Sequence, residues 1–221
     1  MFPSHDSRGK RNLKKKVTKE VLVADGRTQA TIPVRGGAGL PNPESKLSLD
    51  FVANAVTTVT ITWRNILDLV VMGTTTTQLA DVFYSCRLHS VEIWTPDAAA
   101  GVVANWPSLA FDSPSQGDQR VFQIPCTANG GYAKCKPAKS SINGLTWQTS
   151  SSVGCFTLSN VGVGTIVRIN ATFRARMGSG SAVIAANAGS SVVAGTMYLR
   201  GLDGLATASS AWSCIPAAYQ I

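Results

Sequence analysis

The chain has 221 residues, of which 44% are hydrophobic and only 14% are charged, and its formal net charge is +8. This length fits one large β domain or two small ones, and the apolar content is ample for a core. About 25% of the residues of an average soluble domain are charged, so we expect a body this poor in charge to be covered in part by other subunits. The uncharged stretch 177–199 is rich in Gly, Ser, Ala and Asn. We therefore expect no stable membrane insertion.

The first twenty residues form a basic segment with almost nothing apolar. Asp6 and Glu20 oppose seven basic side chains: Arg8, Lys10, Arg11, Lys14, Lys15, Lys16 and Lys19. Like charges at this density repel one another and bury no core, so we expect the segment to be disordered and to bind a polyanion. Nucleic acid is the polyanion that such a segment binds most favourably, because each phosphate contact releases counterions. A solubilising or nuclear-import tail is the other interpretation.

The composition changes after this segment, and three parts are expected. From residue 21 onward the chain has 13 basic and 10 acidic residues, a net charge of only +3. A Gly- and Pro-rich stretch at 36–43 is typical of a hinge. We therefore predict a basic N-terminal arm with its hinge over 1–45, a β domain over 46–178, and a C-terminal extension over 179–221 that packs on it.

Alternation of apolar and polar residues is the dominant pattern of the body, and a period of two predicts strands. It is clearest at 167–177, where one face is apolar and the other carries Arg168, Arg174 and Arg176. A similar strand is predicted at 58–64. Shorter strands are predicted at 47–52, 88–94, 101–106, 120–124, 154–158 and 192–199. Turn-rich stretches separate them, notably at 113–118, 128–131 and 178–181.

One helix is predicted, over residues 76–85. Leu79, Val82 and Phe83 would share one face of it after a Thr-rich start that can cap the helix. Many short strands with Gly and Pro between them and a single small helix are typical of an all-β sandwich or jelly roll, and not of an α/β enzyme.

The sequence offers little for catalysis. Of its two histidines, His5 lies in the basic arm and His89 stands alone in a predicted strand, without a nucleophile motif around it. The glycine-rich stretches lack both the dinucleotide fingerprint and the Lys-Ser/Thr of a P-loop. The odd set of five cysteines has no zinc-site spacing and is expected to be free buried thiols: Cys86, Cys126, Cys135, Cys155 and Cys214. We expect no enzymatic activity.

Two groups of charged residues have alternative interpretations. Asp112 and Asp118 flank a Ser/Pro/Gly loop and either bind Ca²⁺ together with oxygens of neighbouring subunits or are solvated turn residues. The Arg168, Arg174 and Arg176 face either extends the cationic surface against the polyanion or forms salt bridges at a subunit contact. The arm itself has Phe2 as its only aromatic residue, so it is expected to bind phosphates without reading bases.

Two stretches of the sequence carry a family resemblance. The first is FYSCRLHSVEIWTP at 83–96, followed by GVVA at 101–104 and by Asp112, and the second is VGTIVRINATF at 163–173. Both resemble segments of small icosahedral virus coat proteins of the tombusvirus and sobemovirus type. GVVA and Asp112 stand at the distances of that family's next strand and acidic loop, and the second stretch is similar to its last shell strand. Cys86 stands where the family's motif has its second aromatic residue. Related shell domains also occur in small circular single-stranded DNA viruses.

The resemblance implies a single eight-stranded jelly-roll β-sandwich with one short helix, preceded by the disordered basic arm. It implies a coat protein that assembles with itself into an icosahedral shell of about 60 copies or a small multiple. The arm would package a single-stranded genome, and no small-molecule substrate is implied. The protein would occur in the virion and in the host cytoplasm, or in the nucleus if the genome is DNA. A non-capsid, oligomeric nucleic-acid-binding β-module is the alternative.

Overall fold

The computed structural model describes residues 43–97, 106–113, 118–149, 151–175, 183–185, 192–206 and 209–215. The chain divides into two units, Met1–Pro41 and Asn42–Ile221, and all described residues belong to the second. Three parts therefore lie outside the described residues: the basic side chains of the predicted arm, residues 36–42 of the hinge, and residues 101–105 of the strand predicted at 101–106.

The described chain is mostly β, with antiparallel sheets and two short helices, so the all-β class is confirmed. Fourteen strands are described: β1 (Glu44–Ala53), β2 (Thr57–Thr62), β3 (Val70–Gly73), β4 (Gln78–Asp81), β5 (Phe83–Thr95), β6 (Ser108–Ser113), β7 (Asp118–Gln123), β8 (Gly131–Cys135), β9 (Gln148–Thr149), β10 (Gly154–Val161), β11 (Ile166–Ala175), β12 (Val183–Ala185), β13 (Met197–Leu199) and β14 (Trp212–Ile215). The helices are α2 (Trp63–Leu67) and α3 (Ile142–Leu145). In the described part of the chain, no helix is long and apolar enough to cross a membrane.

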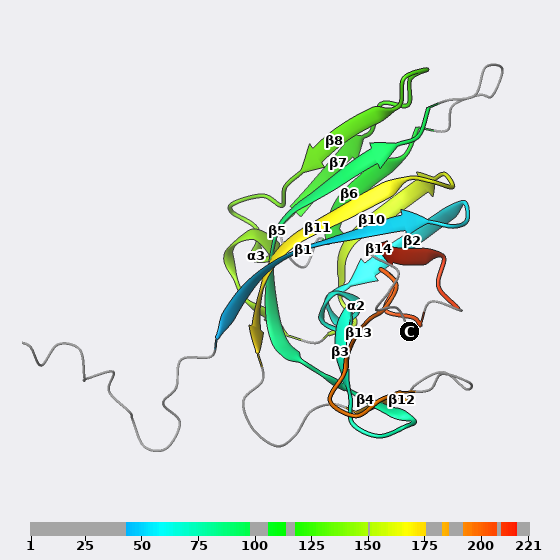
Figure 1. Ribbon diagram of the computed structural model, residues 1–221. Coiled ribbons are helices and arrows are strands. Elements are labelled where there is room, and N and C mark those ends of the chain that lie inside the picture. Colours follow the sequence, from blue (N-terminus) through cyan, green and yellow to red (C-terminus); the bar gives the residue numbers. More distant parts are fainter. Residues whose placement is uncertain are drawn as a thin grey trace, which may run out of the picture. The chain divides into compact units, whose positions relative to one another are not determined.

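Three sheets organise these strands (Figure 1). Sheet A has the order β14-β1-β11-β5-β8, with β9 also paired to β5; sheet B has the order β2-β10-β6-β7; sheet C has the order β12-β4-β3-β13. Four antiparallel pairs are nested along the chain: β1 with β11, β2 with β10, β5 with β8 and β6 with β7. Of the nested strands, β6 and β8 were not predicted from the sequence. The remaining strands are short additions, and among them only β13 lies within a predicted strand, the one at 192–199.

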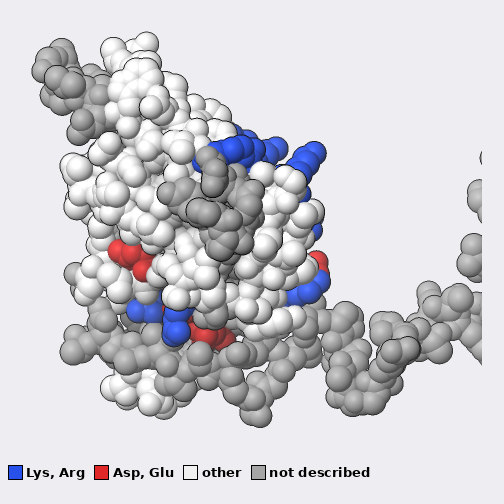
Figure 2. Space-filling model, turned by 180° about the vertical axis from the view of Figure 1, so that it is seen from behind, with Lys and Arg blue, Asp and Glu red and all other residues white. Residues whose placement is uncertain are grey.

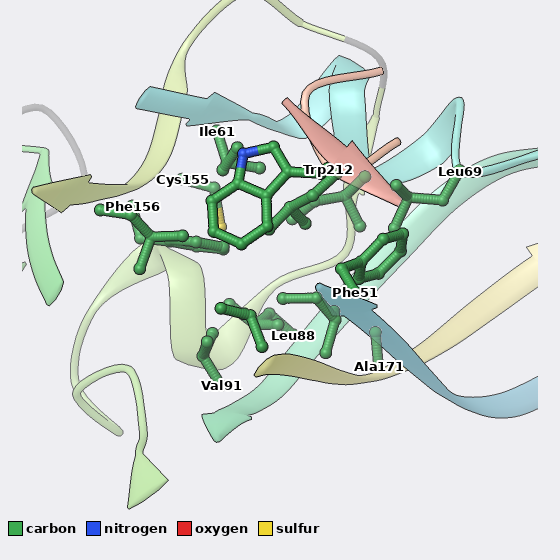
Figure 3. Packing of buried hydrophobic residues seen from close by; sticks show 14 of the residues in the cluster. Phe51, Ile61, Leu69, Leu88, Val91, Cys155, Phe156, Ala171 and Trp212 are labelled. Atoms are coloured by element: carbon green, nitrogen blue, oxygen red, sulfur yellow. The ribbon is translucent and has the colours of Figure 1, made fainter. Parts of the chain in front are cut away.

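Sheets A and B bury their apolar faces in one core (Figure 3). Sheet A contributes Phe51, Leu88 and Val91, and sheet B contributes Ile61 and Phe156, all of them at most 1% exposed. The predicted alternation of β11 is confirmed, since its core-facing residues are at most 2% exposed: Val167, Ile169, Ala171 and Phe173. A separate small cluster beneath sheet C joins Val71, Leu79 and Val192.

The helix predicted at 76–85 is wrong. Residues 78–81 form β4, which pairs with β3 and β12, and Phe83 already begins β5. The β-branched Thr run before Leu79 disfavours a helix, and a strand buries both Leu79 and Phe83 while its backbone groups bond to neighbouring strands.

The helix that does form after β2 begins inside the strand predicted at 58–64. Its first residue is Trp63, and Thr62 precedes it as the N-cap. The Thr62 hydroxyl accepts from the Asn65 backbone N–H at 3.2 Å, and the Asn65 side chain accepts from the Thr62 N–H at 2.8 Å. This reciprocal capping ends the strand at Thr62.

The C-terminal extension joins the body through sheets A and C. β12 and β13 pair with β4 and β3, which are inserted between β2 and β5, and β14 pairs with β1 at the edge of sheet A. Trp212 of β14 is 0% exposed and lies within the main core (Figure 3). This part of the extension therefore completes the core.

Candidate nucleic-acid interface

The outer face of sheet A holds Arg168 and Arg174, and we call it the polar face. Its residues come from β1, β11, β5 and β8: Glu44, Lys46, Ser48, Asp50, Arg168, Asn170, Thr172, Arg174, Arg87, His89, Ser90, Glu92, Trp94, Tyr132 and Lys134. The strand registers arrange them in rows across the sheet, because side chains directly opposite each other on antiparallel strands lie about 5 Å apart.

The first row alternates in charge across four strands. Arg168 donates from Nε and Nη2 to the two carboxylate oxygens of Asp50 at 2.6 and 2.8 Å. On its other side stands Glu92, which accepts from Lys134 Nζ at 2.7 Å and from the Asn170 amide at 3.0 Å. The hydrogen bond from Lys134 lowers the pKa of Glu92, and burial opposes it. Every charge in this row is therefore paired.

Aromatic rings extend this row. The Arg168 guanidinium lies over the Trp94 ring, 5.1 Å from its centroid, and Trp94 contacts Tyr132 with ring centroids 5.2 Å apart. Tyr132 donates from its hydroxyl to Glu92 at 3.3 Å. The Arg168 side chain is held by an ion pair on one side and by a ring beneath it.

A second ion pair lies near the start of β1. Arg174 donates from Nε and Nη2 to Oε1 of Glu44 at 3.0 and 2.8 Å, and its guanidinium lies 3.7 Å from the centroid of the Trp147 ring. Arg168 and Arg174 thus form salt bridges with β1 of their own chain, whereas one of the two alternatives from the sequence placed such bridges at a subunit contact. The Arg176 side chain lies outside the described residues.

Between the two ion pairs lies a row of basic residues. Lys46 of β1 faces Thr172 of β11, which in turn faces Arg87 of β5. His89 joins them because β5 has a bulge there: Asn170 pairs with Ser90 and Ala171 with Leu88, so His89 is the extra residue. Its Nε2 lies 2.6 Å from the Thr172 hydroxyl. Single-sequence patterns did not reveal this row, because the bulge shifts the alternation within β5.

The predicted calcium residues lie at neighbouring strand ends. Asp112 pairs with Gln119, and Ser113 pairs with Asp118, so the backbone positions of both aspartates are close on β6 and β7. Their side chains lie outside the described ones. Among the described side chains, no group of three or more His, Cys, Asp or Glu is placed to hold a metal ion.

The five cysteines are free thiols, as predicted. Cys86, Cys135, Cys155 and Cys214 are buried, and Cys126 is partly buried. Burial raises the pKa of Cys86 to about 12, and it raises the pKa of Cys135 and of Cys214 to about 11. A thiol with such a pKa holds almost no thiolate at neutral pH, so these cysteines are poor nucleophiles.

A buried polar cluster lies where the C-terminal extension meets sheet C. Asp68 follows α2, Asp81 ends β4 and Arg200 follows β13, and they are 6%, 8% and 7% exposed. Burial, followed by the charge of Asp81, raises the pKa of Asp68 to about 7, although Arg64 and Arg200 act in the opposite direction. No sequence pattern predicted this cluster, since each member stands between apolar or Gly neighbours in widely separated parts of the chain.

The free energy of unfolding is expected to fall as the pH rises from about 4 to about 7, and Asp68→Asn is expected to weaken this dependence. A carboxyl whose pKa is raised from 3.8 to about 7 keeps its proton in the folded state over this window and loses it in the unfolded state. One proton bound in this way corresponds to a slope of about 1.4 kcal/mol per pH unit. Urea unfolding at several pH values measures it.

Asp97→Asn, at an exposed carboxylate, is the matched control and is expected to keep the wild-type slope. If Asp68→Asn had the same pH slope as the wild type, Asp68 would not be the titrating group.

Comparison with known proteins adds no family. No protein-family model matches the sequence, and a search of the curated proteins finds no match. Any functional assignment therefore rests on the residues and their arrangement.

Proposed function

We propose that this chain is the coat protein of a small icosahedral virus. In this proposal, a single eight-stranded jelly roll tiles the shell, and the basic arm packages a single-stranded genome. The nested order of the four antiparallel strand pairs carries the proposal, together with the basic arm that precedes them. Activity as an enzyme has no part in it.

The strand order supports the jelly roll. Counting only the eight paired strands in chain order, one sheet runs first, eighth, third, sixth, and the other runs second, seventh, fourth, fifth. This is the order that results when one long hairpin of four nested pairs wraps into a two-layered sandwich of two Greek keys. The jelly roll is common in virus shells but also occurs in other proteins. The fold therefore supports the coat-protein function only in combination with the basic arm and the uncharged surface.

The outer face of sheet B supports assembly with further copies. One row across its four strands consists of Thr60, Thr157, Ala110 and Val121, none of them charged, and Val121 is 62% exposed. Figure 2 shows a face of the molecule on which most of the described surface is uncharged. Interface cores are depleted in charged residues, so such surfaces suit contacts between subunits.

The arm supports packaging. Each copy brings five net positive charges in its first twenty residues, and about 60 copies or a small multiple of them would line the shell with a dense cationic layer. Such binding depends on phosphates and weakens with salt, and it leaves open whether the genome is RNA or DNA. We also propose that Asp112 and Asp118 bind Ca²⁺ together with oxygens of a neighbouring subunit.

Electron microscopy and mass measurement of the purified protein test this function. We expect closed shells of uniform size that protect host nucleic acid from added nuclease. A protein that binds nucleic acid but stays a dimer or other small oligomer at high concentration would instead be the non-capsid β-module. A protein that stays monomeric and does not bind polynucleotides at low salt would contradict both the coat protein and the β-module.

A further inference from the structure

The basic row on the polar face has a fixed geometry. Lys46 and Arg87 lie on either side of β11 at two strand spacings, about 10 Å between their backbones, with Thr172 between them. Arg87 is anchored, because its Nη2 donates to the carbonyl of Gly144 at 3.0 Å. His89 is anchored by the contact of its Nε2 with the Thr172 hydroxyl. Arg87 and His89 are therefore positioned before any ligand arrives.

The positive charge of this row is not balanced by the carboxylates around it. The nearest carboxylates on the same face are engaged: Glu44 binds Arg174, and Glu92 binds Lys134. Among the described residues, neither Lys46 nor Arg87 has an ion-pair partner, and the Arg87 Nε is buried without a hydrogen-bond partner. Burial, then Arg87, then Lys46 lower the pKa of His89. The charges of Arg87 and Lys46 thus both act on the imidazole of His89.

We propose that Lys46, Arg87 and His89 form a phosphodiester-binding subsite on the body for the same nucleic acid that the arm captures. This inference rests on the proposed function and deepens it, since it adds a second contact point outside the arm. Lys46 supplies a flexible exposed charge, and the anchored guanidinium and imidazole orient a phosphate. Lys19, the last of the seven basic residues of the arm, is 27 positions before Lys46, so a polymer bound by the arm is tethered to the body.

The two histidines of the chain make the subsite testable in the full-length protein. His5 reports on the arm, and His89 reports on the polar face. Carbethoxylation by diethylpyrocarbonate modifies neutral imidazole, and mass spectrometry of separated peptides gives the reactivity of each histidine against pH. The measurement is made on protein stripped of nucleic acid, before and after addition of oligouridylate.

We expect oligouridylate to raise the midpoint of His89 reactivity by about one pH unit, because a phosphate beside the ring favours its charged form. The direction separates this from simple covering of His89 by another subunit, since burial alone lowers the midpoint. Lys46→Ser is expected to reduce the shift by at least half. Lys136→Ser, at an exposed lysine that does not act on the His89 pKa, is expected to retain it.

Each outcome separates the subsite from the packaging function. If oligouridylate protected His5 from diethylpyrocarbonate but left the pH midpoint of His89 reactivity unchanged, the subsite would be overturned and the arm's function would stand. The subsite would also be overturned if oligouridylate lowered the pH midpoint of His89 reactivity. The same would follow if Lys46→Ser and Lys136→Ser reduced the change in that midpoint equally. If neither histidine responded, the proposed packaging function itself would fail.

Discussion

Deletion of residues 1–20 is expected to yield shells that are empty or smaller and to abolish nucleic-acid packaging. The deleted segment holds seven of the 20 basic residues and only two acids, so the net charge of each copy falls from +8 to +3. Binding to phosphates through released counterions is additive in such charges, and its loss is multiplied over all copies of a shell. The ratio of absorbance at 260 and 280 nm after nuclease treatment measures the packaged nucleic acid.

The body should be unaffected by this deletion, because its described core contains no residue before β1. The thermal midpoint is therefore expected to match that of the full chain. A variant with the first twenty residues in shuffled order is the control, and it should package normally because phosphate contacts carry no sequence information. Retained packaging by the deletion variant at physiological salt would contradict the role of the arm.

Trp212→Ala is expected to lower the free energy of unfolding by about 3–5 kcal/mol, the range for truncating a large buried aromatic side chain. Trp212 is 0% exposed, and its strand β14 pairs with β1, where Trp212 lies opposite Ala53. Its indole fills space between core residues of both sheets, so the smaller side chain leaves a cavity (Figure 3). Urea unfolding monitored by circular dichroism measures the loss.

Two further variants make this prediction specific. Ile215→Ala, on the same strand but 46% exposed, is expected to change stability by no more than about 0.5 kcal/mol. Trp212→Phe should lose less than Trp212→Ala, because the ring remains and the indole Nε1 has no hydrogen-bond partner among the described residues. Equal effects of Trp212→Ala and Ile215→Ala would show that β14 contributes little to the core.

The sequence predicted those strands whose faces differ most in polarity. β11 could be predicted because its apolar and polar residues alternate without a break, and its neighbours bury one face. β5 could be predicted only in part, since the bulge at His89 shifts the alternation between Leu88 and Val91. The helix prediction failed for Leu79 because spacing alone cannot tell a short helix from a short buried strand.

The site residues were harder to predict than the strands, because strand register and tertiary packing bring them together, and neither can be read from a single sequence. Arg168 was predicted on an outer face, but its partner Asp50 is 118 positions away, and only the register of β1 with β11 brings the two together. Asp68 and Asp81 are likewise joined by tertiary packing, which no local pattern encodes. The role of the arm's charges stays a prediction from composition, because the arm lies outside the described residues. It can be made from composition alone, since a dense run of like charge needs no register to act.

The nested pairing also governs when a newly synthesised chain can complete its fold. Its outermost pair joins β1 to β11, and β14 is added last at the edge beside β1. Strand pairs between residues far apart in the sequence form slowly. Here they can form only after almost the whole polypeptide has left the ribosome. The amino-terminal cationic segment is translated first, well before the sandwich can close. In the coat protein proposed above, this order of translation would separate binding of the nucleic acid from growth of the shell in time. Incomplete chains would then not compete for places in the particle.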